Sequence, residues 1–142
     1  RNGSVGSTEV ILLDTHVLIW SDQRDRRLGR RTAALLERHW EADSVAIAAI
    51  TFWELALLVD RGRLQLPMPV GQYRDSTIAY GFTELALDGA TAIRAVDLQG
   101  LPDDPADRLI VATALTHDAI LVTGDERLLA WKHGLERQDA RL

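Results

Sequence analysis

The sequence predicts an α/β domain in which helices cover both faces of a mostly parallel sheet of four or five strands. Short unbroken runs of Val, Ile and Leu, typical of buried parallel strands, alternate with segments of helical spacing along the whole chain. No repeat or evident linker divides the 142 residues, and this length suits one domain with a sizeable core. We therefore expect a single domain over residues 8–142. Residues 1–7 are interpreted as a flexible tail or a remnant of an expression vector.

Two strands and two helices are expected in the first fifty residues. "EVILLDT" (9–15) has the continuous apolar run of a buried strand, and a short helix in "HVLIW" (16–20) follows it. "RRTAALLERHWEA" (30–42) has the spacing of a helix with one apolar face. "SVAIAAI" (44–50) then predicts a second buried strand.

The middle of the chain is expected to be mainly helical. "TFWELALLVDRGRL" (51–64) predicts a helix that ends near Gly62, and the prolines after it mark a loop. "VGQYRDSTIAYG" (70–81) has a weaker helical pattern. "FTELAL" (82–87) is typical of a strand, and "DGATAIRAVD" (88–97) of a helix.

The last part of the chain is expected to contain two helices and two strands. "PADRLIVATALTHD" (105–118) is apolar on almost every side, which predicts a buried helix. "AILVTGD" (119–125) predicts a strand, "ERLLAWKHG" (126–134) a closing helix and "LERQDA" (135–140) an edge strand. Strands that alternate with helices in this way form βαβ units, whose ligands bind beyond the carboxyl ends of the strands.

Composition restricts the class of protein. Without cysteine the chain can form neither a disulfide nor a thiolate metal site, which suits the cytoplasm. No apolar run approaches the roughly 18 residues of a membrane span, so we expect no membrane association. The net charge of -5 argues against broad, charge-driven binding of nucleic acid. Five arginines between Arg24 and Arg31 suit phosphate and equally suit a solvated helix edge, so their role stays open.

Two aspartates stand where parallel strands are expected to end. Asp14 follows the first apolar run and Asp125 follows the last one. An acid in this position can cap the next helix, because its oxygen accepts the free N–H groups of the first turn. It also lies at the rim of the sheet where ligands bind. Each residue is therefore a helix cap or a functional group.

Glu54 has two interpretations as well. Thr51 and Glu54 match a capping box, in which the threonine caps the helix and the glutamate returns to the cap three residues later. The same geometry holds the glutamate in the first turn of a helix that follows a strand. Glu54 could therefore serve as a ligand as readily as a cap.

The stretch "DDPAD" contains three aspartates that are not equivalent. Asp104 suits the N-cap of the buried helix and Pro105 its first position, where the missing N–H has no consequence. Asp107 lies inside the first turn, next to residues expected to pack on the sheet, and there it needs a cation or a hydrogen-bond network. Asp103 is expected in solvated loop.

In this topology Asp14, Glu54, Asp107 and Asp125 converge at one rim of the sheet. Clustered carboxylates repel one another, which raises their pKa values unless positive charge is present. Mg²⁺ or Mn²⁺ would supply that charge, since hard cations prefer oxygen ligands. Such a site suits metal-assisted hydrolysis of a phosphodiester.

Four segments carry most of these residues: "LLDTHVLIW", "AITFWELALLVDRGRL", "LPDDPADRLIVATAL" and "AILVTGDERLL". In order and spacing, from about Val10 to Leu129, they resemble the signature segments of PIN-domain ribonucleases, specifically VapC-type toxins of type II toxin–antitoxin systems. The resemblance implies a three-layer α/β/α sandwich and a Mg²⁺- or Mn²⁺-dependent endoribonuclease that hydrolyses RNA. It also implies a cognate antitoxin protein as partner and a homodimer.

The resemblance assigns roles to individual residues. The four acids of the family fall on Asp14, Glu54, Asp107 and Asp125, which would form the catalytic metal site. Glu54 would either complete this site through water or orient the nucleophile. Thr123 matches a position whose hydroxyl could hold a water molecule or a phosphate, or could simply end a strand. Asp104 could lie in the outer shell of the site, although a helix cap is favoured.

The sequence alone does not assign a role to several apolar side chains or to the histidines. The apolar side chains of Trp20, Trp40, Trp53, Leu18 and Leu57 could contact a partner or pack in the core. The four histidines show no metal-ligand spacing and receive no role.

Three other classes of protein match part of this pattern of acids. A haloacid-dehalogenase-like phosphatase would need an aspartate where His16 stands, and a response-regulator receiver would need a lysine after a late strand, whereas Lys132 lies within a predicted helix. A non-catalytic PIN-like module that binds proteins is the more serious alternative. The complete set of acids argues against it, because clustered carboxylates without metal would lower stability.

Overall fold

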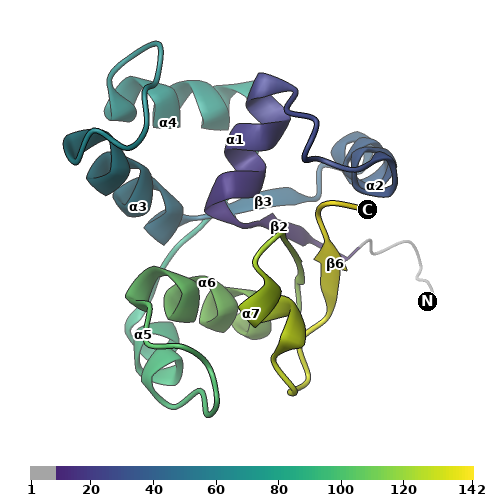
Figure 1. Ribbon diagram of the computed structural model, residues 1–142, viewed down its shortest axis with the longest axis vertical. Helices are drawn as coiled ribbons and strands as arrows, with labels where there is room; N and C mark the ends of the chain where they lie inside the picture. Colours follow the sequence, from purple (N-terminus) through teal and green to yellow (C-terminus); the bar gives the residue numbers. More distant parts are fainter. Residues whose placement is uncertain (1–8) are drawn as a thin grey trace.

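The computed structural model describes residues 9–142, which fold around one sheet (Figure 1). All five strands are parallel, in the order β4-β3-β2-β5-β6. Their bounds are β2 Ile11–Leu13, β3 Val45–Ala48, β4 Thr83–Leu85, β5 Ile120–Thr123 and β6 Arg137–Asp139. The central register places Leu12 of β2 between Ala46 and Leu121. The predicted parallel sheet is therefore confirmed, and the C-terminal segment is an edge strand as expected.

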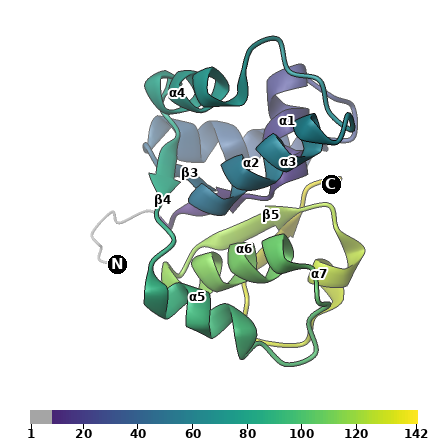
Figure 2. The ribbon, with the colours of Figure 1, turned by 90° about the vertical axis from the view of Figure 1, so that its left-hand side faces the viewer.

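Helices cover both faces of the sheet, which makes the three layers of an α/β/α sandwich (Figure 2). The helices are α1 Thr15–Gln23, α2 Arg30–Glu41, α3 Ala49–Asp60, α4 Val70–Tyr80, α5 Gly89–Val96, α6 Pro105–Thr116 and α7 Glu126–Ala130. The first four lie on one side and the last three on the other (Figures 1 and 2). No helix in this part of the chain is long and apolar enough to cross a membrane.

Alternation along β2 divides the core into two clusters. Ile11 and Leu13 face the side of α1 to α4, where they pack with residues such as Leu55. Leu12 faces the other side and packs with residues of α6 such as Ile110. All of these side chains are fully buried. The unbroken apolar run of this strand is thus explained by burial on both faces.

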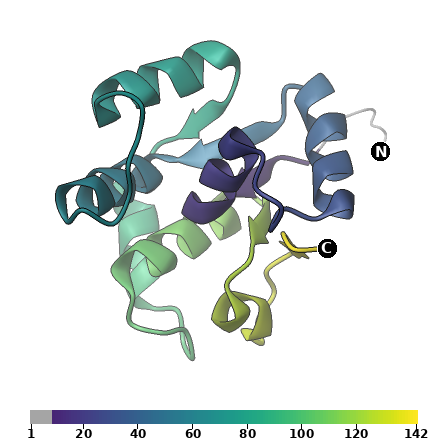
Figure 3. The same ribbon diagram turned by 45° about the horizontal axis from the view of Figure 1, so that its top comes forward.

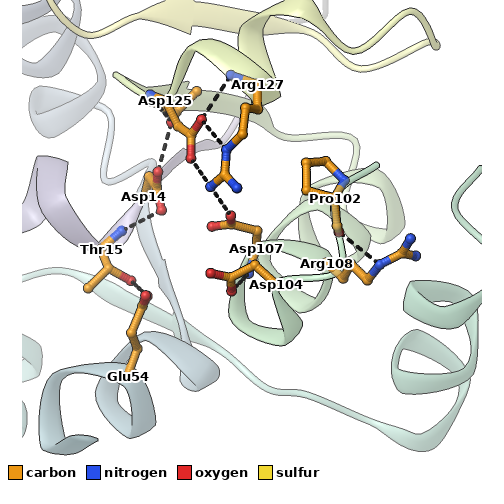
Figure 4. Close-up of polar contacts among 10 residues, drawn as sticks. Asp14, Thr15, Glu54, Pro102, Asp104, Asp107, Arg108, Asp125 and Arg127 are labelled. Atoms are coloured by element: carbon orange, nitrogen blue, oxygen red, sulfur yellow. Dashed lines mark hydrogen bonds and ion pairs between the residues drawn. The ribbon is translucent and has the colours of Figure 1, made fainter. Parts of the chain in front are cut away.

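The link from α5 to α6 is fixed by one arginine. The guanidinium of Arg108 donates to four backbone carbonyls, those of Ala95, Leu98, Leu101 and Pro102, at 2.8 to 3.1 Å. These bonds hold residues 95–102 against the first turn of α6 (Figure 4). The start of α6 is therefore a rigid part of the fold.

The C-terminal end packs beside the start of α2 (Figure 3). The backbone N–H of Gly29 donates to the carbonyl of Ala140, and that of Thr32 to Leu142. Thr32 is fully buried, and its hydroxyl donates to the Asp139 carbonyl at 3.1 Å. These bonds bind β6, the edge strand, to the helical layer.

Several element boundaries differ from the prediction. Helix α3 begins at Ala49, so the strand before it ends at Ala48 and the Thr51 capping box is wrong. Helix α7 ends at Ala130, because Trp131 is extended and turns into the core, where its Nε1 donates to the Gln99 carbonyl. Helix α1 extends to Gln23. The predicted tail, residues 1–7, lies outside the described residues.

The apolar side chains that could contact a partner or pack in the core differ in their exposure. Leu18 and Trp20 are buried, so they belong to the core. Trp53 is 50% exposed on α3, and Leu57 is partly exposed on the same helix. Trp40 is partly buried and packs edge-to-face on Phe82, with ring centroids 4.9 Å apart.

Candidate active site

A pocket of about 270 Å³ lies at the carboxyl edge of the central strands. Five acids line it, and they come from four separate parts of the chain: Asp14, Glu54, Asp104, Asp107 and Asp125. Figure 4 shows these side chains directed toward one another from different elements. The structure thus brings together all four acids that the sequence singled out, along with Asp104.

Asp14 is the most buried acid of the pocket, with 6% of its surface exposed. It caps α1, since one carboxylate oxygen accepts the Thr15 N–H at 2.8 Å. The other oxygen accepts the Thr123 hydroxyl at 2.7 Å. Burial raises the pKa of Asp14, although these two hydrogen bonds act in the opposite direction.

Thr123 lies behind the acids and does not open into the pocket. Its side chain is fully buried, and its hydroxyl also accepts the Asp125 N–H at 3.0 Å. One hydroxyl therefore connects the end of β2 to the turn after β5. This arrangement suits the outer-shell role of Thr123, but a direct bond to a water molecule or phosphate in the pocket is not available to it.

Glu54 is held by two threonines rather than by a capping box. The Thr15 hydroxyl donates to Glu54 Oε1 at 2.5 Å, and Thr51 lies 3.1 Å from the same hydroxyl. Because α3 begins at Ala49, Thr51 lies inside the helix and cannot cap it. Burial raises the pKa of Glu54 and the negative charge of Asp14 raises it further, whereas the hydrogen bond from Thr15 acts in the opposite direction.

The aspartates before and within α6 differ as predicted. Asp104 caps the helix by accepting the Asp107 N–H at 3.1 Å, with Pro105 in the first turn. Asp107 is 7% exposed, and burial, with the nearby charges of Asp104, Asp14 and Asp125, raises its pKa to about 7. Asp103 is fully solvated.

Arg127 crosses the pocket between two of the acids. Its backbone N–H donates to Asp125 Oδ1 at 2.8 Å, and Asp125 in turn caps α7. Its Nη2 lies 2.8 Å from Asp125 Oδ2 and 3.1 Å from Asp107 Oδ2. The hydrogen bond to this guanidinium is the largest cause of the lowered pKa of Asp125.

Sequence reasoning missed three residues of the pocket: His16, Trp20 and Arg127 all line it. His16 received no role, because a single histidine without ligand spacing gives no metal signal. Its position two residues after Asp14 was the available signal, and Arg127 stands at the same distance from Asp125. Gly124 explains the place of Trp20, since a Cβ there would lie 2.7 Å from the indole.

The donor chemistry of the pocket fits a hard divalent cation. The acids supply oxygen ligands of the kind that Mg²⁺ and Mn²⁺ prefer. Burial disfavours the charged forms of Asp14 and Asp107 and raises the pKa of both, so a bound cation would stabilise their carboxylates. As they stand, no three acidic or histidine side chains of residues 9–142 converge on one ion position. Metal binding would therefore require the acids to move closer, with Arg127 lying between two of them.

Comparison with known proteins identifies the fold. The family model of the PIN domain matches residues 11–132. The chain belongs to the PIN-domain family. Ribonuclease VapC22 of Mycobacterium tuberculosis is 39% identical to it over 124 residues, which cover 87% of this chain and 92% of that relative.

Solved structures support the same PIN fold. VapBC2 from Rickettsia felis, bound to a promoter DNA fragment, gives a TM-score of 0.68 at 17% identity, covering 91% of this chain and 97% of the other. At that identity the likeness concerns the fold alone. A toxin–antitoxin complex from Klebsiella pneumoniae gives a TM-score of 0.57 at 26% identity, covering 88% and 94%.

Proposed function

We propose that this PIN domain is an endoribonuclease that hydrolyses RNA phosphodiester bonds at the carboxylate pocket. The observation that carries the proposal is the convergence of acids from four parts of the chain in one pocket. The similarity to Ribonuclease VapC22 supports RNA as the substrate class. By the same similarity, and because of the toxin–antitoxin complexes of like fold, the protein would be the toxin of such a pair.

The acids would divide the work of the site. Asp14, Asp107 and Asp125 would hold Mg²⁺ or Mn²⁺. When bound, the ion supplies a more acidic water molecule and stabilises charge on the phosphate. Glu54, fixed by the Thr15 hydroxyl, would orient the attacking water or complete the metal site. Thr123 would act as a positioning residue, since it holds Asp14 and the Asp125 backbone from behind.

The proposal extends to partners and location. An antitoxin protein would bind the chain and block the pocket, and exposed apolar side chains such as Trp53 could contribute to that contact. A homodimer and a place in the cytoplasm, where RNA substrates are found, are part of the same proposal.

RNA cleavage by the purified protein tests the proposal. A mixture of transfer, ribosomal and messenger RNA is incubated with Mg²⁺ or Mn²⁺, with and without EDTA. We expect cleavage that EDTA abolishes and that Asp107→Asn removes. Asp103→Asn is the matched control, because Asp103 stands four residues earlier in the same segment but is solvated. Metal-independent cleavage, or full activity of Asp107→Asn, would contradict the proposal.

The alternative of a non-catalytic binding module predicts a different result. Such a protein would leave RNA intact under every metal condition and would still bind an antitoxin. The raised pKa of Asp107 argues against it, because ionising this buried acid at neutral pH lowers the stability of the fold. Cleavage by the wild type together with loss in Asp107→Asn would exclude the alternative.

A further inference from the structure

Three short segments of this chain share one local geometry. In each, an arginine two residues after an aspartate folds back onto it, so that the arginine N–H bonds one carboxylate oxygen and the guanidinium bonds the carboxylate. The N–H to Oδ1 distances are 2.9, 2.8 and 3.0 Å. The Nη2 to Oδ2 distances are 2.7, 2.8 and 3.1 Å. The pairs are Asp25 and Arg27, Asp125 and Arg127, and Asp139 and Arg141.

Only one of these three arginines also reaches a buried acid. Arg127 Nη2 lies 3.1 Å from Asp107 Oδ2, and the Asp107 side chain is 10% exposed. Arg141 also contacts a second acid, Glu126, but that side chain is 81% exposed. The local turn explains why Arg127 pairs with Asp125. It does not explain the contact across the pocket with Asp107, which is 20 residues away in the sequence.

In its contact with Asp107, the Arg127 guanidinium supplies the positive charge that a bound cation would supply. Asp107 and Asp125 are both proposed ligands, and two carboxylates that face one pocket repel each other unless positive charge lies between them. The Arg127 guanidinium supplies that charge through a nitrogen shared by both carboxylates. A metal ion bound to the same Asp107 oxygen would need the position of this nitrogen.

We propose that Arg127 is a built-in counter-ion that a divalent cation must displace from Asp107 when the site loads. The inference rests on the proposed function, since it concerns the same metal site. In the metal-free protein Arg127 holds Asp107 and Asp125 together. On metal binding its Nη2 leaves Asp107, while the fold-back pairing with Asp125 can persist or rearrange locally. Arg127 therefore lowers the affinity of the site for metal.

The exposure of Arg127 and its single bond to Asp107 would allow this displacement. The Arg127 side chain is 55% exposed, so it has room to turn outward. Its link to Asp107 is a single shared bond, whereas its link to Asp125 is made through Nε, Nη2 and the backbone N–H. The guanidinium end of this ion pair is exposed to solvent, which weakens the attraction to Asp107, so a cation with several oxygen ligands can compete with it.

Mn²⁺ titration followed by electron paramagnetic resonance tests the displacement. The spectrum of free Mn²⁺ gives the dissociation constant of the full-length wild type and its variants. We expect Arg127→Gln to bind Mn²⁺ about fivefold more tightly, the effect of removing one competing exposed ion pair. Arg127→Lys should lie between the two, because it keeps the charge but loses the forked geometry.

Arg141→Gln is the matched control. It removes the same charge from the same kind of turn, and neither Asp139 nor Glu126 lines the pocket. Its Mn²⁺ affinity should equal that of the wild type. Equal affinity of Arg127→Gln and wild type, or weaker binding by Arg127→Gln, would overturn the proposal. An equal gain in Arg141→Gln would also overturn it, because the effect would then be one of net charge.

A second measurement separates this proposal from the nuclease assignment. In the absence of metal, Arg127→Gln should lower the melting temperature of the otherwise wild-type protein. The same substitution should lower the melting temperature less in a protein that already carries Asp107→Asn. Equal effects in both backgrounds would mean that the two residues are not coupled. Failure of the wild type to bind Mn²⁺ would overturn the metal-dependent function and the displacement together. Mn²⁺ binding that is unaffected by Arg127→Gln would overturn the displacement alone.

Discussion

Two helix starts in this protein use the same residue type with opposite electrostatic results. Asp14 caps α1 in the pocket, and Asp88 caps α5 by accepting the Thr91 N–H at 2.8 Å. Both follow parallel strands. Burial raises the pKa of Asp14. Asp88 is exposed, and the hydrogen bonds that Asp88 makes with Thr91 lower its pKa. Capping alone therefore explains Asp88, while Asp14 has a capping role and a burial that capping does not require.

The comparison separates a local role from a functional one. A capping aspartate is stabilised by the N–H groups it accepts, wherever it stands. A capping aspartate that is also buried among other acids loses stability when it ionises. Asp14 meets the second description, and Asp88 meets only the first. Asp107 caps no helix, but it shares the burial among other acids. Burial of several acids in one pocket thus marks the site better than sequence position does.

The largest expected effect is on catalysis. Asp14→Asn keeps the size of the side chain and removes the ligand charge, so we expect RNA cleavage to fall on the order of 100-fold or more. Asp88→Asn should cleave RNA at the wild-type rate. Initial rates of cleavage, with circular dichroism as a check on folding, measure the difference. Comparable losses in the two variants would show that capping, and not the pocket, is what matters.

The next effect concerns pH. The pKa of Asp107 is raised to about 7, so the folded protein binds this proton more tightly than the unfolded chain does. The resulting stability is full below the ordinary value of 3.8 and is lost as pH rises toward and past about 7. Asp107→Asn should therefore stabilise the metal-free protein at pH 8, by about 2–4 kcal/mol, and much less at pH 5.

Urea unfolding at the two pH values measures this change. Asp88 has a lowered pKa, so its contribution has the opposite sign: it is present above the ordinary value and is lost as pH falls. Asp88→Asn should accordingly matter less at low pH than at neutral pH. A pH-independent effect of Asp107→Asn would contradict the assignment of a buried, proton-binding carboxyl.

A smaller effect is expected behind the pocket. Thr123→Val removes the hydroxyl that serves Asp14 and the Asp125 N–H, and we expect a loss of about 1–3 kcal/mol in unfolding free energy. Cleavage should fall as well, because Asp14 loses its fixed orientation. Thr113→Val is the control: Thr113 is equally buried, but its hydroxyl bonds the Leu109 carbonyl within α6. It should lose stability without a specific loss of cleavage.

The smallest effect belongs to the local cap. Asp88→Ala leaves the first turn of α5 without its side-chain acceptor, and we expect a small loss of stability. Thermal unfolding measures it, and RNA cleavage below the melting temperature should not change. Loss of cleavage at a temperature where the variant stays folded would give Asp88 a role that its position in the structure does not explain.

The predicted fold rested on patterns that burial imposes directly. The unbroken apolar runs of β2, β3 and β5 reflect strands covered on both faces, so their parallel arrangement could be read from the sequence. The Asp104 cap was also predictable, because Pro105 fixes where the helix begins. In these places local preference and tertiary structure agree.

The errors arose where tertiary contacts override local rules. Thr51 and Glu54 fit a capping box, yet the Thr51 hydroxyl lies against Thr15 of another helix, and α3 starts earlier. Trp131 continues a helical pattern but turns into the core. The contact between Arg127 and Asp107 links a turn to a distant helix, so no local pattern could have predicted it.

The hydrogen bond between Thr123 and Asp14 joins residues 109 positions apart. During synthesis on the ribosome, Asp14 emerges long before β5, which supplies the neighbouring central strand. A nascent chain therefore contains Asp14 before the Thr123 hydroxyl that bonds it. Asp107 is added when α6 emerges, and Asp125 only with the turn after β5. The proposed nuclease would thus be inert toward RNA until β5 and the turn that carries Asp125 have emerged from the ribosome and folded beside β2.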